Sequence, residues 1–174
     1  MRIISGINKG RKFIIPSNLP VRPTTDRAKE AIFNILENRY QLENKSILDL
    51  CSGTGNISFE FGSRGCKEIT AVDKDKYCCR FISNMADKLN YNIDIERKDC
   101  LEFIDKTNKQ YDIIYADPPY NFRYYHQLQK KISDRNLIRK NGCLIMEHDS
   151  NTDFDTENVE LRKYGSVHFS IFAY

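Results

Sequence analysis

The sequence lacks the features that mark membrane, exported and repetitive proteins. In its 174 residues no apolar stretch approaches the ~20 residues of a membrane span. The first residues reach Gly, Asn and Lys too early to form the apolar core of a signal peptide. No repeat, low-complexity tract or linker rich in Pro, Gly or Ser interrupts the chain. With 40% hydrophobic and 29% charged residues, the chain is typical of one soluble globular domain over residues 1–174.

The sequence also lacks a cysteine pattern for metal binding or disulfide formation. It has six cysteines but no C-x-x-C pair, and the adjacent Cys78 and Cys79 are a poor basis for a disulfide or a zinc site. The remaining four are Cys51, Cys66, Cys100 and Cys143. We therefore expect small buried thiols in a protein of the reducing cytoplasm, with no bound metal.

The chain has little net charge, +3 from 27 basic and 24 acidic residues, but this charge is unevenly distributed. Residues 1–29 contain seven bases and one acid, whereas the rest of the chain contains 20 bases and 23 acids. A basic N-terminal segment on a near-neutral body indicates a polyanionic partner. The alternative interpretation is an ordinary solvated surface.

Short apolar segments alternate with amphipathic ones over most of the chain. We expect an N-terminal β-hairpin with strands at 2–5 and 11–15, then a helix capped by Thr24 or Thr25 and ending near Tyr40. Strands are expected at 46–50, 68–72, 93–97, 112–116 and 143–147, with helices at 56–64, 77–89, 101–107 and 124–132. This alternation predicts an α/β fold with a doubly wound, mostly parallel sheet. Segments 158–161 and 167–173 predict an antiparallel hairpin at its edge.

Acidic residues follow three of the predicted strands, where the carboxyl ends of parallel strands share one edge. The first strand leads into Asp49, Gly53 and Gly55, but position 58 is Ser where a dinucleotide fingerprint has its third glycine. The Asp49 carboxylate would repel a pyrophosphate, whereas it suits the amino group and sulfonium of S-adenosylmethionine. Asp73 is placed to bind ribose hydroxyls, and Asp99 to accept from an adenine amino group. Together these residues predict an S-adenosylmethionine site and exclude a nicotinamide dehydrogenase.

The fourth strand leads into the motif Asp117-Pro118-Pro119-Tyr120. A carboxylate and a proline carbonyl that accept the hydrogens of an exocyclic amine would free its lone pair to attack a methyl group. Tyr120 provides a ring on which a base can stack. The alternative is a rigid turn with a packed tyrosine. Asp rather than Asn at 117 favours guanine, which presents two adjacent donors, but it leaves adenine open.

The two motifs together resemble the class I amino-methyltransferases. The segments Arg2-Ile-Ile-Ser-Gly, Gly10-Arg-Lys, Arg22-Pro-Thr-Thr-Asp-Arg27 and Lys163-Tyr-Gly are similar to the RsmD family of bacterial 16S rRNA guanine-N2 methyltransferases. This resemblance implies a Rossmann-like core over residues 24–174 with an N-terminal hairpin extension over residues 1–23. It also implies methyl transfer from S-adenosylmethionine to N2 of one guanine in 16S rRNA, within the small ribosomal subunit. Nothing in the sequence demands more than a monomer, and the cysteines indicate a cytoplasmic protein.

The resemblance assigns three sets of site residues. Cofactor binding is assigned to Asp49, Gly53, Gly55, Asp73, Asp99, Cys100 and Thr24. Catalysis is assigned to Asp117, Pro118, Pro119 and Tyr120. RNA binding is assigned to Arg2, Lys9, Arg11, Lys12, Arg22 and Arg27.

The chain departs from the family pattern at two places and leaves two alternatives. Many relatives have Phe-Ala at positions 51–52 and Ala-Leu-Gly at positions 56–58, where this chain has Cys-Ser and Asn-Ile-Ser. One alternative is an adenine-N6 methyltransferase acting on DNA or RNA, although this chain has no room for the target-recognition region usual in the DNA enzymes. The other is a non-catalytic rRNA-binding assembly factor, against which the intact acids and glycines of the two motifs argue.

Overall fold

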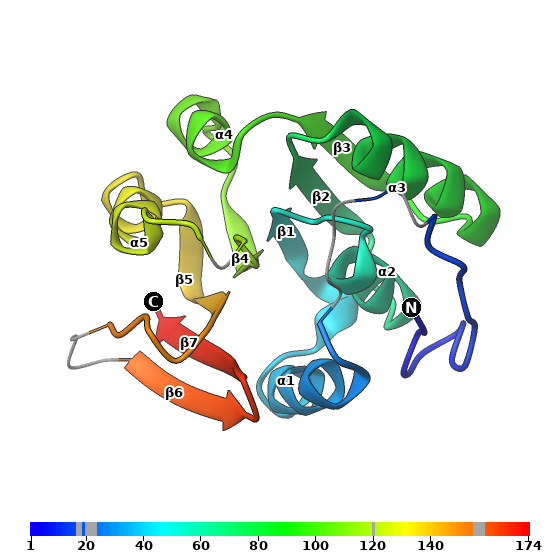
Figure 1. The fold of residues 1–174 in the computed structure, drawn as a ribbon, viewed down its shortest axis with the longest axis horizontal. Helices are drawn as coiled ribbons and strands as arrows, with labels where there is room; N and C mark the ends of the chain where they lie inside the picture. Colours follow the sequence, from blue (N-terminus) through cyan, green and yellow to red (C-terminus); the bar gives the residue numbers. More distant parts are fainter. Residues whose placement is uncertain (17–18, 20–23, 120, 155–158) are drawn as a thin grey trace.

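The fold is a seven-stranded sheet covered by helices on both faces (Figure 1). The structure, a computed structural model, describes residues 1–16, 19, 24–119, 121–154 and 159–174. Its helices are α1 (Asp26–Arg39), α2 (Asn56–Ser63), α3 (Lys76–Leu89), α4 (Cys100–Lys106) and α5 (Tyr125–Asp134), with a 3-10 turn at Leu42–Asn44. Its strands are β1 (Ser46–Leu50), β2 (Glu68–Asp73), β3 (Ile93–Arg97), β4 (Tyr111–Ala116), β5 (Ile138–His148), β6 (Val159–Tyr164) and β7 (Val167–Ala173).

The sheet order β3-β2-β1-β4-β5-β7-β6 confirms the predicted fold class. Strands β1 to β5 are parallel, β7 runs antiparallel to β5, and β6 closes the edge antiparallel to β7. Chain order reverses between the neighbours β1 and β4, which is the point where open α/β sheets bind ligands.

Apolar side chains on the two faces of the sheet form separate clusters. On one face Leu48 and Ile114 pack with α4 and α5. On the other face Ile47 and Ile113 pack with α1 and α2, while α3 packs beside them over β2. Because both faces are covered, β1 is buried at every position, which explains its nearly continuous apolar sequence.

Strands β2 and β4 differ from their predicted bounds by one residue, whereas β5 and β6 differ by three or more because they carry polar residues. Strand β5 begins at Ile138 rather than at 143, and Arg139 to Asn141 within it are exposed. The register with β4 also shifts between Tyr111 and Ile113. Strand β6 extends to Tyr164 rather than to 161, with exposed polar residues on the sheet edge. Such segments lack the apolar signal by which a strand is predicted.

The N-terminal segment pairs less regularly than the predicted hairpin. A single antiparallel bridge joins Arg2 and Lys12. Beside this bridge Ile3 N donates to Arg11 O at 3.0 Å, and Gly10 N donates to Ile3 O at 2.9 Å. The pairing ends after Ile3 because the next two backbone amides donate to a helix side chain: Ile4 N to Glu60 Oε2 at 2.8 Å, and Ser5 N to Glu60 Oε1 at 3.0 Å. The segment is therefore docked on α2 through a carboxylate, and its two arms pair antiparallel as predicted but over a shorter stretch than residues 2–5 and 11–15.

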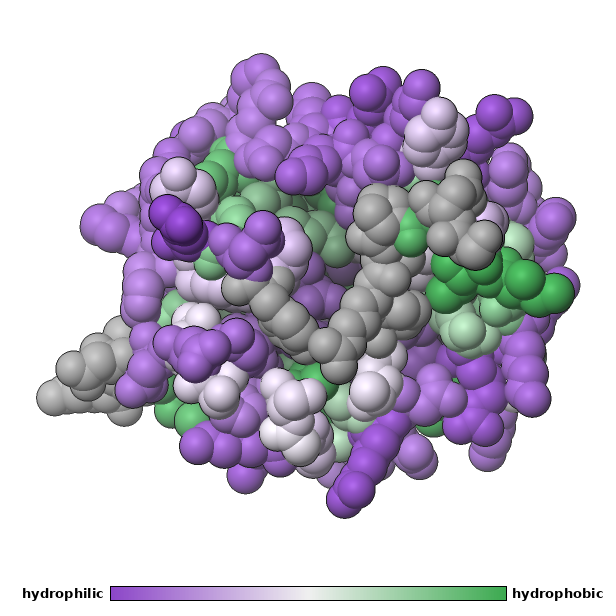
Figure 2. All heavy atoms as spheres, in the orientation of Figure 1, coloured by the Kyte–Doolittle hydropathy of each residue, from purple (hydrophilic) through white to green (hydrophobic). Residues whose placement is uncertain are grey.

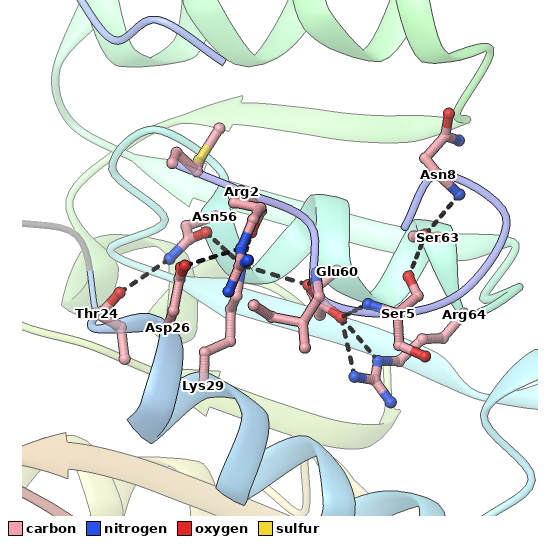
Figure 3. Close-up of polar contacts among 12 residues, drawn as sticks. Arg2, Ser5, Asn8, Thr24, Asp26, Lys29, Asn56, Glu60, Ser63 and Arg64 are labelled. Atoms are coloured by element: carbon pink, nitrogen blue, oxygen red, sulfur yellow. Dashed lines mark hydrogen bonds and ion pairs between the residues drawn. The ribbon is translucent and has the colours of Figure 1, made fainter. Parts of the chain in front are cut away.

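Glu60 belongs to a buried charge network that joins the N-terminal segment, α1 and α2 (Figure 3). Lys29 Nζ lies 3.3 Å from Glu60 Oε2 and donates to Arg2 O at 2.6 Å and Asn56 Oδ1 at 2.7 Å. Arg64 Nη2 lies 2.9 Å from Glu60 Oε1. Lys29 and Glu60 are both 0% exposed. Lys29, counted in the sequence among the bases available to a polyanion, instead neutralises a buried acid.

Two backbone segments approach so closely at Gly6 that no side chain fits there. Gly6 has φ +82°, and a Cβ there would lie 1.9 Å from Ser63 O. Gly10 also has φ +82°, but nothing lies within 4 Å of its Cβ position. We expect Gly6→Ala to lower the free energy of unfolding by about 3 kcal/mol and the control Gly10→Ala by about 1 kcal/mol, measured by urea denaturation. Equal effects would contradict the close docking.

No helix among the described residues is long and apolar enough to cross a membrane. All six cysteines are free thiols, five of them buried and Cys51 partly so, which confirms their expected burial. Within the described part of the chain no group of three or more His, Cys, Asp or Glu side chains is arranged to hold a metal ion.

Candidate active site

A cavity of about 490 Å³ opens at the carboxyl ends of β1, β2 and β4, beside the reversal of strand order. Figure 2 shows the surface hollowed near the middle of this face, with hydrophilic atoms in the hollow. Nine of the predicted site residues line the cavity: Thr24, Asp49, Gly53, Asp73, Asp99, Cys100, Asp117, Pro118 and Pro119. The topology thus brings together side chains that lie up to 95 residues apart in the sequence.

The glycine turn after β1 serves two purposes. Gly53, at φ +52°, lines the cavity. Gly55, at φ +74°, precedes α2, and a Cβ there would lie 3.0 Å from Ile82 and 3.1 Å from Phe59. Gly55 is absent from the cavity lining and permits close packing against α3. The structure therefore gives this glycine a packing role, and its contact with a cofactor stays a prediction.

Asp49 is a buried acid beneath the cavity, 1% exposed. Its Oδ2 accepts from Ser58 N at 3.0 Å and from Ser58 Oγ at 2.5 Å. Burial, with a smaller contribution from the negative charge of Asp73, raises the pKa of Asp49 to about 7 against the opposing effect of the hydrogen bonds from Ser58. Because a nearby positive charge would favour the ionised form, this carboxyl is suited to a cationic ligand.

The raised pKa of Asp49 predicts a pH-dependent stability. Between its ordinary value of 3.8 and about 7 the folded protein binds more protons at this site than the unfolded chain does, so the free energy of unfolding falls as pH rises through this window. Asp49→Asn removes that loss. In the ligand-free protein we expect the variant to be more stable than the wild type by about 2–4 kcal/mol at pH 8, and by much less at pH 5.

Urea denaturation at both pH values tests this expectation. The matched control is Asp87→Asn, which makes the same change at an exposed position of α3. The control variant should show the same difference in the free energy of unfolding between pH 5 and pH 8 as the wild type. An equal effect of Asp49→Asn at the two pH values would contradict the raised pKa.

Asp73 and Asp99 are oriented by backbone hydrogen bonds. Asp73 Oδ2 accepts from Gly53 N at 2.7 Å, and its Oδ1 accepts from Asp75 N at 2.8 Å. Asp99 caps α4 by accepting from Leu101 N at 2.9 Å. Each ionised carboxylate has about four acceptor sites, so both retain capacity for ligand hydroxyl or amino groups.

Asp117 follows β4 directly, and its backbone N donates to Leu50 O at 3.1 Å. This bond fixes the residue where β1 and β4 meet. Burial raises the pKa of Asp117 well above its usual range, and the negative charges of Glu147 and Asp49 raise it further. The Pro118 carbonyl accepts a long hydrogen bond of 3.4 Å from Tyr125 Oη, and a carbonyl oxygen has a second lone pair that can accept from a ligand. Tyr120, the last residue of the motif, lies outside the described residues.

The site contains an acid that the sequence analysis missed. Glu147, 3% exposed in β5, lines the cavity and accepts from Thr24 Oγ1 at 2.8 Å and from Tyr115 Oη at 2.6 Å. Its signal was present, since a charged residue at the end of an otherwise apolar strand needs a polar partner inside the fold. No local pattern indicates that partner, because Thr24 lies 123 residues away.

The predicted RNA-binding residues that the structure describes lie at the surface. Arg2, Lys9, Arg11, Lys12 and Arg27 are exposed. Arg2 Nε also lies 3.0 Å from Asp26 Oδ2, so part of its charge is compensated. Arg22 lies outside the described residues.

Comparisons with known proteins show which families and folds this chain is similar to. A family model described as "Conserved hypothetical protein 95" matches residues 1–173. The chain is 33% identical over 149 residues to ribosomal RNA small subunit methyltransferase D of Buchnera aphidicola subsp. Acyrthosiphon pisum, covering 84% of this chain and 77% of that protein. It is 28% identical over 169 residues to the protein of the same name from Haemophilus influenzae, covering 94% of this chain and 86% of that protein.

Solved structures share the fold. A Thermus thermophilus protein superposes with a TM-score of 0.87 at 20% identity, covering 99% of this chain and 98% of that one. The T. thermophilus 16S rRNA N2 G1207 methyltransferase, solved with AdoMet and guanosine, superposes with a TM-score of 0.72 at 15% identity, covering 89% and 45%.

Proposed function

This chain belongs to the ribosomal RNA small subunit methyltransferase D (RsmD) family, and we propose that it transfers a methyl group from S-adenosylmethionine to the exocyclic N2 of a guanine in 16S rRNA. One observation carries the proposal. Asp117 and Pro118 line the same cavity as Asp49, Gly53 and Asp73, so one site holds both the motif for an exocyclic amine and the acids for a cationic cofactor.

The residues of the cavity fit S-adenosylmethionine. A volume of about 490 Å³ lies within the range of small-molecule sites, and several carboxyl groups face a ligand that carries an ammonium and a sulfonium. Asp49 would hold the positive end, Asp73 the ribose, and Asp99 with Cys100 the adenine. When bound, the cofactor supplies a methyl group on a positively charged sulfur.

The chain's own groups then act on the guanine. Asp117 accepts from N1–H and from N2–H, and the Pro118 carbonyl accepts the second N2 hydrogen. These contacts draw the nitrogen towards tetrahedral geometry, so that its lone pair is free to attack. Asp117 also takes the proton that the methylated amine loses.

The exposed bases of residues 1–29 give the RNA a docking surface. Lys and Arg side chains that contact phosphates supply affinity without sequence choice. Residues 1–23 then form an RNA-binding extension of a catalytic core over residues 24–174. Because the target base must leave its stack to reach Asp117, we expect a loop or bulge of 16S rRNA as the substrate. We expect a monomer as the active form.

Transfer of labelled methyl groups tests the proposal. The protein is incubated with labelled S-adenosylmethionine and one of three acceptors: naked 16S rRNA, small subunits that lack the modification, or duplex DNA. We expect label in 16S rRNA, either naked or within the subunit. Label in DNA alone, or in none of the three acceptors, would contradict the proposal.

Charge reversal at Arg11 and Lys12 tests the docking surface. Each lost phosphate contact lowers the slope of log affinity against log salt by about 0.7–0.9, so Arg11→Glu with Lys12→Glu should weaken RNA binding and lower the slope by about 1–2. The control Lys140→Glu changes an exposed lysine near the start of β5, at the opposite end of the sheet from the cavity. An unchanged slope in the double variant would show that both residues belong to an ordinary solvated surface and do not contact RNA phosphates.

A further inference from the structure

An exposed aromatic ring lies close to the cavity, shortly after the Asp117 motif. Tyr124 is 54% exposed. It directly precedes α5, and its side chain makes no capping hydrogen bond to that helix. The centroid of its ring lies 5.7 Å from that of Phe122, with 80° between the two planes. Because Phe122 lines the cavity, a single side chain separates the Tyr124 ring from the cavity.

Phe122 is held in place by contacts with the catalytic turn. Its backbone N donates to Pro119 O at 2.7 Å. Its ring packs against Tyr125, with centroids 5.4 Å apart and planes at 88°. Tyr125 is 5% exposed, and its hydroxyl donates to Pro118 O at 3.4 Å. The Tyr124 ring therefore rests on a pre-formed support, which lowers the entropy lost when a ligand packs on it.

A basic residue without an acidic partner lies between the two rings in the sequence. Arg123 is exposed and makes no ion pair with any described residue. Two bases further along, in α5, are compensated: Lys130 Nζ lies 2.9 Å from Asp134 Oδ2, and Lys131 forms an ion pair with Asp105. The charge of Arg123 is thus available to a phosphate, whereas the charges of the two lysines are partly neutralised.

An exposed ring and an adjacent base are the two kinds of group that single-stranded nucleic acid binds. Aromatic side chains stack on bases of any sequence, because every base has a π face, and cationic side chains contact the backbone. A target base that leaves its stack also uncovers the faces of the bases beside it. A ring close to the site that receives the target base can cover one of these faces.

We propose that Tyr124 stacks on a nucleotide next to the target guanine and that Arg123 contacts a phosphate of the same strand. These two residues form a second RNA-binding surface, separate in sequence from the docking surface of residues 1–29. The inference rests on the proposed function, which brings RNA to this cavity.

Binding of naked 16S rRNA in the absence of cofactor, measured at several salt concentrations, tests the proposal. We expect Tyr124→Ala to raise the Kd about 5- to 150-fold without changing the slope of log affinity against log salt, because stacking releases no counterions. Tyr124→Phe should keep the wild-type Kd. Tyr124→Leu, which keeps apolar bulk but has no π face, should bind as weakly as Tyr124→Ala. Arg123→Gln should lower the slope by about 0.7–0.9.

The matched control is Tyr174→Ala. Tyr174 is 37% exposed, and its backbone N donates to Gly142 O near the start of β5, at the opposite end of the sheet from the cavity. This variant should keep the wild-type Kd for RNA within about twofold. The cofactor Kd of Tyr124→Ala should also stay within about twofold, since the cavity itself is unchanged.

Four results would overturn the stacking surface. They are a Kd of Tyr124→Ala within about twofold of the wild type, full recovery by Tyr124→Leu, loss of cofactor binding in Tyr124→Ala, and weaker binding to small subunits but not to naked RNA. The second would show apolar packing, the third a structural role, and the fourth a contact with protein.

Failure of the proposed function gives a different result. If the wild type binds 16S rRNA but methylates none of it, the proposed methyl transfer fails, and the Kd values of the Tyr124 variants still decide for or against stacking. If the wild type methylates small subunits but does not bind naked 16S rRNA, the stacking surface fails and the proposed function stands.

Discussion

Asp117→Ala is expected to lower methyl transfer by at least about 10³-fold while cofactor affinity stays within about tenfold. The variant loses both the acceptor that aligns the amine and the group that takes its proton, and these effects are individually worth about 10²–10⁴-fold. Single-turnover transfer to 16S rRNA measures the first quantity, and calorimetric titration with S-adenosylmethionine the second. Loss of cofactor binding instead of transfer would make Asp117 a cofactor ligand and contradict its role at the base.

Asp117→Asn distinguishes the two candidate bases. An amide offers one acceptor and one donor, which matches adenine, whereas guanine needs two acceptors for N1–H and N2–H. We therefore expect Asn to fail almost as severely as Ala. The matched control is Asp112→Asn, which makes the same change at the start of β4, where the side chain pairs with Lys45 and Arg139 away from the cavity. Wild-type activity in Asp117→Asn would favour adenine.

Glu60→Met is expected to lower the free energy of unfolding by about 3–5 kcal/mol. The change leaves Lys29 buried without its counter-charge and removes the acceptor of the Ile4 and Ser5 amides. Arg64 keeps its ion pair with Glu37 and its position over the Phe33 ring. Urea denaturation measures the loss, and limited proteolysis should show faster cleavage within residues 1–16.

The double variant Lys29→Met with Glu60→Met provides the control for this network. Because it removes both buried charges, it should be less destabilised than the sum of the two single variants. A loss below about 1 kcal/mol in Glu60→Met would show that the N-terminal segment is held in place by its apolar contacts alone.

The predicted fold was confirmed where local sequence decides the structure. The strands at 46–50 and 93–97 have the predicted bounds, and the helix after Thr25 begins as its cap predicts. What the sequence could not predict depends on contacts between distant residues. The amides of Ile4 and Ser5 leave the hairpin for an acid more than 50 residues away, and no local pattern announces that choice.

The site was predictable to the extent that topology determines it. Acids at the ends of parallel strands must meet at one edge, so Asp49, Asp73 and Asp117 line one cavity. The individual roles depend on packing: Gly55 is pressed against α3, and the importance of Glu147 became visible only with its distant partner Thr24. Burial of Lys29 likewise requires the N-terminal segment to cover it.

Identification of the methylated nucleoside tests the central claim most directly. Small subunits that lack the modification are incubated with the protein and S-adenosylmethionine, and the 16S rRNA is digested and analysed by mass spectrometry. We expect N2-methylguanosine at a single position, absent when Asp117→Ala replaces the wild type. N6-methyladenosine, or no new methylated nucleoside, would contradict it.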